Sequence, residues 1–94
     1  MRLAANIDAN QPDVVRALRA AGASVTILSS VGHGVPDLLV GVRNVTTVFE
    51  IKDGAKPACR RKLTEDEEKW HAGWRGSKYV VESVEQALQI LASL

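Results

Sequence analysis

The sequence lacks most features that would place it in a specialised class of protein. It has a single cysteine, Cys59, so an intramolecular disulfide is impossible and nothing indicates an oxidising compartment. No segment approaches the run of about 20 apolar residues that a membrane-spanning helix needs, and residues 1–8 lack the apolar core of a signal peptide. These absences predict a cytoplasmic protein with no membrane partner.

The sequence also lacks repeats, low-complexity tracts and linkers, and its 94 residues leave no room for two domains. Residues 1–94 are therefore expected to form one domain, whose small core would gain from self-association as a homodimer. The final helix and an uncovered sheet edge are the candidate interfaces. A net charge of only +1 argues neither for nor against a nucleic-acid partner.

Basic residues are nevertheless concentrated in one segment, which follows Lys52. Lys56, Arg60, Arg61 and Lys62 lie there, with Asp53 as the one acid between positions 52 and 62. Such a local patch is typical of proteins that contact phosphate groups. The alternative is a solvated basic loop without a partner.

Hydrophobic periodicity and chain-breaking residues predict the element order α-β-β-β-α-β-α. Asn10, Thr64 and Ser83 are expected to cap the three helices, and Thr64 with Glu67 matches a capping box. Short loops favour an antiparallel meander of the first three strands, and a helical crossover makes the third and fourth parallel. The result is an α/β fold with a mixed four-stranded sheet flanked by helices. The strands are expected at 24–28, 38–42, 45–52 and 78–81, and the helices from 11 to 21, from 64 to about 75 and after 83.

Two charged residues, Glu50 and Lys52, interrupt the apolar strand expected at 45–52. Side chains two residues apart share one face of a strand, and buried charges are costly unless they are paired, hydrogen-bonded or holding a metal. Asp37, at the start of the preceding strand, supplies a second carboxylate. Carboxylates suit Mg²⁺ or Mn²⁺, so the three residues predict a metal-dependent phosphodiesterase centre. The alternative is a turn residue, Asp37, beside an exposed ion pair on a half-solvated strand.

The remaining candidate residues are aromatic, histidine or cysteine side chains. His33, in a glycine-flanked loop, is expected either to reach a phosphate or to be an ordinary solvated histidine. Trp70 and Trp74 are expected to anchor the buried face of their helix rather than to stack on bases. His71 is expected on the helix surface, and the histidines with Cys59 do not form a zinc-ligand pattern.

The order and spacing of several short motifs resemble a known family. The motifs are Gly34–Gly41, Phe49–Gly54, Leu63–Glu67, then Trp70-His71 and Trp74–Gly76. Together they resemble the stand-alone VRR-NUC nucleases, the virus-type replication and repair nucleases of the PD-(D/E)XK superfamily. The resemblance covers most of the chain.

The resemblance implies a restriction-endonuclease-like core and a Mg²⁺- or Mn²⁺-dependent DNA endonuclease without a small organic cofactor. Its substrate would be duplex or branched DNA, such as the Holliday junctions that arise in DNA repair. By resemblance, Asp37, Glu50 and Lys52 are the catalytic residues. Asp37, Glu50 and the backbone carbonyl of Ile51 would hold the metal. The expected DNA-binding residues come from the loop context and the local charge instead, and they are His33, Lys56, Arg60, Arg61 and Lys62.

Two positions depart from the family pattern. Relatives carry an acidic residue in the first helix that faces the site, and either Asp8 or Asp13 could supply it here. Relatives also place a glutamine where this sequence has Glu67, and a carboxylate cannot donate the hydrogen bond that an amide can. The alternative function is a nucleic-acid-binding or assembly module that has the nuclease fold but does not cleave.

Overall fold

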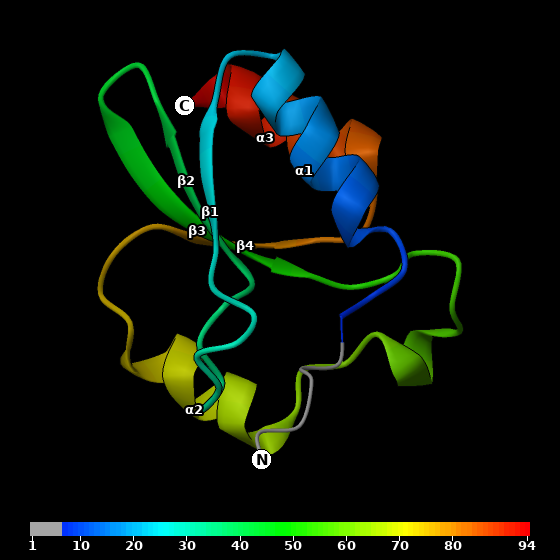
Figure 1. The fold of residues 1–94 in the computed structure, drawn as a ribbon. Helices are drawn as coiled ribbons and strands as arrows, with labels where there is room; N and C mark the ends of the chain where they lie inside the picture. Colours follow the sequence, from blue (N-terminus) through cyan, green and yellow to red (C-terminus); the bar gives the residue numbers. More distant parts are fainter. Residues whose placement is uncertain (1–6) are drawn as a thin grey trace.

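The computed structural model describes residues 7–94, in which the helices and strands follow the predicted order (Figure 1). The elements are α1 (Gln11–Ala20), β1 (Ser24–Ile27), β2 (Leu38–Val42), β3 (Val45–Ile51), η1 (Ala58–Arg60), α2 (Glu65–Gly73), β4 (Lys78–Val81) and α3 (Val84–Ser93). The short 3₁₀ helix η1 was not expected. Residues 1–6 lie outside the described part of the chain. Two predictions are therefore not tested there, the absence of a signal peptide and the start of the domain at residue 1.

The strands form one sheet in the order β1-β2-β3-β4. β1 pairs antiparallel with β2, β2 pairs antiparallel with β3, and β3 pairs parallel with β4 after the crossover through α2. Arg43 and Asn44 close the β2–β3 hairpin with φ values of 47° and 64°, a left-handed pair that suits the twist of a two-residue hairpin turn. The predicted mixed sheet is confirmed.

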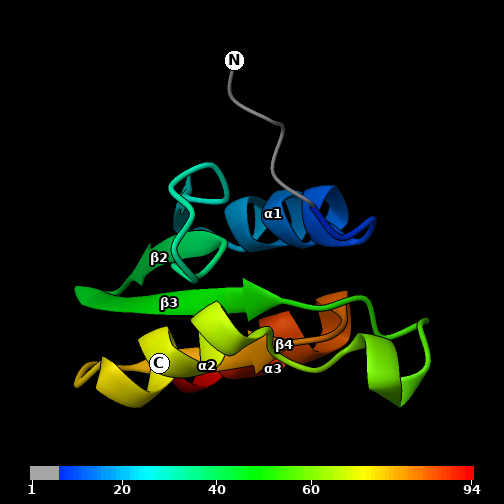
Figure 2. The same ribbon diagram turned by 90° about the horizontal axis from the view of Figure 1, so that it is seen from below.

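The two faces of the sheet carry different side chains and different helices. Alternation along the strands points Val40, Phe49 and Val81 to one face, where they form the core with α1 and α3. These two helices lie side by side on that face (Figure 1). α2 lies on the opposite face, in front of the sheet in Figure 2. Three layers result, with the apolar core on one side of the sheet only.

Helix capping follows the prediction at two ends and departs from it at the third. The Thr64–Glu67 capping box is present, and the Ser83 hydroxyl accepts a hydrogen bond from the Gln86 N–H. Asn10 precedes α1 but makes no side-chain capping bond. Its amide nitrogen donates instead to the Lys52 carbonyl at 3.0 Å and the Glu82 carbonyl at 3.3 Å. Asn10 therefore ties the start of α1 to the ends of β3 and β4.

The expected burial of α2 is wrong in two respects. The Trp74 side chain is 42% exposed and stacks on the half-buried Trp70 ring at a centroid distance of 4.8 Å, outside the core. His71, expected on the surface, is only 8% exposed. The reason is that α2 packs on the charged face of the sheet, so its inward side is polar and its aromatic pair lies toward solvent.

The topology places the predicted site residues together. In the β2–β3 register Leu38 lies opposite Phe49, so the start of β2 adjoins the end of β3. Asp37 and Glu50 are the next residues along each strand.

None of the helices in residues 7–94 is long and apolar enough to cross a membrane.

Candidate active site

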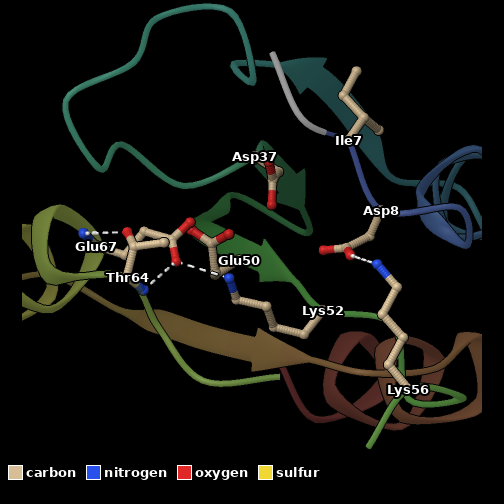
Figure 3. Close-up of a pocket in the computed structure, with 8 residues that line it drawn as sticks. All are labelled: Ile7, Asp8, Asp37, Glu50, Lys52, Lys56, Thr64 and Glu67. Atoms are coloured by element: carbon tan, nitrogen blue, oxygen red, sulfur yellow. Dashed lines mark hydrogen bonds and ion pairs between the residues drawn. The ribbon is translucent and has the colours of Figure 1, made fainter. Parts of the chain in front are cut away.

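A pocket of about 440 Å³ opens where the end of β3 meets the start of β2, α2 and the segment before α1. Figure 3 shows the Asp37 and Glu50 side chains directed toward one space, with Lys52 beside them. The residues that line the pocket are Ile7, Asp8, Asp37, Glu50, Lys52, Lys56, Thr64 and Glu67. The three predicted catalytic residues are thus brought together.

The Asp37 carboxylate is held by hydrogen bonds on both of its oxygens. Oδ2 accepts from the Ile51 backbone N–H at 2.8 Å, and Oδ1 accepts from the Ser29 hydroxyl at 3.1 Å. The Gln11 amide nitrogen in turn donates to the Ser29 hydroxyl oxygen at 3.0 Å. Gln11 is only 3% exposed although it lies in the first turn of α1. This chain of contacts links α1 to Asp37 and orients the carboxylate.

Glu50 is the most deeply buried acid of the site, with 2% exposure. Its Oε1 atom has no hydrogen-bond partner among the described residues. Burial, followed by the neighbouring Asp37 carboxyl group, raises the pKa of Glu50 to about 10. A buried, unpartnered oxygen beside a second carboxylate is the environment that a divalent cation would stabilise, because the cation compensates both negative charges.

Lys52 shares the sheet face of Glu50 and is 8% exposed. Its Nζ donates to Glu67 Oε1 at 2.8 Å, and the same oxygen accepts from the Thr64 N–H at 2.8 Å. Burial alone would lower the pKa of Lys52, but the Glu67 carboxylate raises it above its ordinary value. Lys52 is therefore a fixed cation. The alternative of an exposed ion pair between Glu50 and Lys52 is wrong, since both side chains are buried.

The structure separates the two candidate acids near the first helix. Asp8 lines the pocket and pairs with Lys56, whose Nζ lies 3.4 Å from Asp8 Oδ1. The Asp13 side chain is 61% exposed and pairs with Arg16 on the outer surface of α1. Asp8 is therefore the acid that the fold brings to the site.

The basic residues expected to contact DNA differ in their surroundings. Lys56 lines the pocket, whereas Arg61 pairs with Glu82 at 3.2 Å. Arg60 and Lys62 are exposed. His33 is also exposed, with a φ of 58°, and is not among the lining residues.

Sequence reasoning missed two features, the Gln11–Ser29 link and the inward position of His71. His71 Nε2 lies 3.9 Å from Glu50 Oε1, and neither atom has a hydrogen-bond partner in the described chain. Only the spacing of His71, four residues after Glu67, could have indicated that both face the same way. No sequence signal identifies Gln11.

The donor set for a metal is small but chemically suited to one. Within residues 7–94, no group of three or more His, Cys, Asp or Glu side chains is placed to hold a metal ion. A hard cation at this pocket would therefore use the Asp37 and Glu50 carboxylates together with backbone carbonyl and water oxygens, which Mg²⁺ and Mn²⁺ accept readily.

Comparison with known proteins assigns the family. A scan against protein-family models gives no match, and no curated protein matches the sequence. A solved structure described as a "VRR_NUC domain" is similar to this chain at 30% sequence identity, with a TM-score of 0.56. The similarity covers 90% of this chain and 97% of the other. The fold is that of a nuclease-type domain, for which nucleic acid is the expected partner, and the chain belongs to the VRR-NUC domain family.

Proposed function

We propose that this protein is a Mg²⁺- or Mn²⁺-dependent endodeoxyribonuclease that hydrolyses phosphodiester bonds of duplex or branched DNA, including Holliday junctions formed in DNA repair. The observation that carries the proposal is the buried Glu50 carboxyl group, with an unpartnered oxygen, beside Asp37 and Lys52. Such perturbed and unsatisfied groups in a pocket are typical of functional sites.

The charges of the pocket support a cation. Four acidic side chains line it, Asp8, Asp37, Glu50 and Glu67, against the two lysines Lys52 and Lys56. A phosphodiester is itself anionic, so its approach to a predominantly acidic pocket is unfavourable without a further positive charge. A bound divalent cation would supply Lewis acidity, lowering the pKa of a coordinated water and stabilising charge on the phosphate.

The backbone of Ile51 supports a third oxygen ligand beside Asp37 and Glu50. The N–H and C=O groups of one strand residue point to the same side, and the Ile51 N–H donates to Asp37 on the β2 side. Continued beyond the Leu38–Phe49 pair, the register would place Pro36 opposite Ile51. Proline has no N–H, so it offers the Ile51 carbonyl no ladder hydrogen bond. The Pro-Asp pair thus leaves an acceptor directed toward the site.

Lys52 would act on the substrate from the same sheet face. Its ammonium group can donate to a phosphate oxygen or orient the attacking water, because Glu67 occupies only one of its three donors. Asn10 holds the Lys52 carbonyl and so limits movement of the strand end. A fixed cation stabilises developing negative charge without reorganisation.

The test is cleavage of single-stranded, duplex, flap and four-way-junction DNA with Mg²⁺ or Mn²⁺, compared with EDTA. Asp37→Ala, Glu50→Ala and Lys52→Ala should each reduce cleavage by about a hundredfold or more, equivalent to roughly 3 kcal/mol of barrier. Asp13→Ala, at the exposed acid outside the pocket, is the matched control and should cleave normally. Glu50→Ala protein that cleaves like wild type would disprove the assignment, and DNA binding without cleavage in any cation would favour the non-cleaving module.

We also propose that the active species is a homodimer. Two observations support it. β1 is an edge strand, and apolar side chains are exposed at its end and in the loop that follows, where Ile27 is 50% and Val31 is 53% exposed. The final helix is the weaker candidate, since Ile90 and Leu94 pack against the core. Light scattering should give twice the mass of one chain, and Ile27→Asp should lower the measured mass. A wild-type protein that is a monomer on DNA would contradict the proposal.

The cytoplasmic location stays a prediction.

A further inference from the structure

Helix α2 places one side chain opposite each charged residue at the end of β3. Glu67 contacts Lys52 through the 2.8 Å hydrogen bond, and His71 Nε2 faces Glu50 Oε1 at 3.9 Å. Glu67 and His71 are one helical turn apart, a rise of about 6 Å, while Glu50 and Lys52 are separated by about 6.6 Å along the strand. The spacing on the helix therefore matches the spacing on the strand, and the helix runs opposite to the strand. A single placement of α2 accounts for both contacts.

The placement of α2 is reinforced on both sides of His71. Lys78 of β4 donates to the backbone carbonyls of His71 at 2.5 Å and Trp74 at 3.2 Å, which holds the last turn of the helix. At the other end, Gly34 packs so closely that an added Cβ would lie 2.2 Å from the Asp66 carbonyl oxygen. The backbone that carries His71 is thus held in position by contacts that do not involve Glu50.

The contact between His71 and Glu50 is incomplete in a way that indicates a role. Both facing atoms are buried, both lack a hydrogen-bond partner among the described residues, and 3.9 Å is about 1 Å too long for a hydrogen bond. An unsatisfied buried pair is costly, so its presence indicates another state of the protein in which both atoms are paired. A Glu50 carboxylate that binds a cation is anionic, and it would then attract the imidazole N–H.

We propose that His71 is a positioning residue for Glu50: its Nε2–H donates to the carboxylate when Glu50 binds a divalent cation, and so selects which oxygen faces the metal. The proposal rests on the proposed function, because it assumes a cation at Asp37 and Glu50. In a neutral imidazole one ring nitrogen carries a proton, so Nε2 can act as the donor. Such outer hydrogen bonds orient metal-binding carboxylates in other proteins.

The experiment measures Mn²⁺ binding to the DNA-free protein by titration calorimetry. His71→Leu removes the donor and should weaken Mn²⁺ binding by about tenfold or more, as is typical for the loss of such a contact. In His71→Gln the amide nitrogen can reach the place of Nε2, so affinity should stay within about threefold of wild type. His71→Asn keeps a polar amide that is too short to reach Glu50, and it should behave like His71→Leu. Glu68→Gln, at an exposed position of α2, is the control and should bind like wild type.

The pattern across the variants decides the question. Loss of affinity in His71→Leu and His71→Asn with recovery in His71→Gln supports the proposal, and the two amide variants suffice if the leucine variant does not fold. Equal affinity in all variants overturns it while leaving the proposed function intact. Equal weakening in His71→Gln and His71→Leu also overturns it, because shape rather than donation would then matter. Wild-type protein that binds no Mn²⁺ overturns the metal-dependent function itself.

Discussion

Replacement of Glu50 by glutamine should change how the stability of the metal-free protein depends on pH. In the native state the pKa of Glu50 is about 10, against 4.5 for the free side chain, chiefly because the carboxyl group is buried. Between these values the native protein keeps the proton and the unfolded chain releases it. The stability that the native state gains from this proton is fully present below pH 4.5 and is lost progressively as pH rises toward 10. The free energy of unfolding of the wild-type protein therefore falls as pH rises.

The magnitude follows from linkage. One proton held by the native but not the unfolded state lowers the free energy of unfolding by at most about 1.4 kcal/mol per pH unit, or about 2.7 kcal/mol from pH 6 to pH 8. The Glu50→Gln amide does not titrate, so this contribution disappears. The pKa of Glu67 is lowered and that of Lys52 is raised, so neither group titrates between pH 6 and pH 8, and the lowered pKa of His71 affects both proteins.

The assay is urea unfolding of wild type and Glu50→Gln at pH 6, 7 and 8 in EDTA, with Glu68→Gln as the exposed control. Glu50→Gln should gain stability relative to wild type at each step, and Glu68→Gln should run parallel to wild type. Adding Mg²⁺ at pH 8 should stabilise wild type by about 2.7 kcal/mol at a hundred times the dissociation constant, and Glu50→Gln much less. Parallel curves for wild type and Glu50→Gln would show that the native carboxyl is ionised without metal, and the reasoning would be refuted.

Three further outcomes are expected. Gly34→Ala should lower the free energy of unfolding by about 1–3 kcal/mol more than Gly32→Ala. Both glycines have φ near 80°, but only at Gly34 would the added Cβ meet the Asp66 backbone. Equal losses for the two variants in urea unfolding would rule out this close contact as the cause. The double variant with glutamate at both Arg60 and Lys62 should bind all DNA sequences more weakly by the same factor. The slope of log affinity against log salt concentration should become shallower by up to about 1.8. An unchanged slope in binding titrations would mean that these side chains are only solvated. Ca²⁺ should support DNA binding with little cleavage, because it takes more ligands at longer distance than Mg²⁺; equal turnover in the two metals would contradict this.

Local sequence signals were sufficient for the four strands and the three α-helices, though not for η1, and for bringing the candidate site residues to neighbouring strand ends. The hairpin turn at Arg43-Asn44 and the capping box of α2 depend on residues within a few positions of one another, and both are present. Alternation along the strand is enough to place Glu50 and Lys52, the residue after β3, on one face. Asp37 could be added because short loops make consecutive strands neighbours.

Tertiary packing decided which side of each helix faces the site, and that is where the sequence was insufficient. Asp8 rather than Asp13 reaches the pocket because the segment before α1 crosses the end of β3, while Asp13 lies on the outer surface of α1. The pair Trp70 and Trp74 would be the natural buried stripe over an apolar surface. α2 instead covers Glu50 and Lys52, so Glu67 and His71 face inward and the rings lie outside the core. A helix turns its apolar side inward only when the surface beneath it is apolar, and the sequence of the helix does not specify that surface.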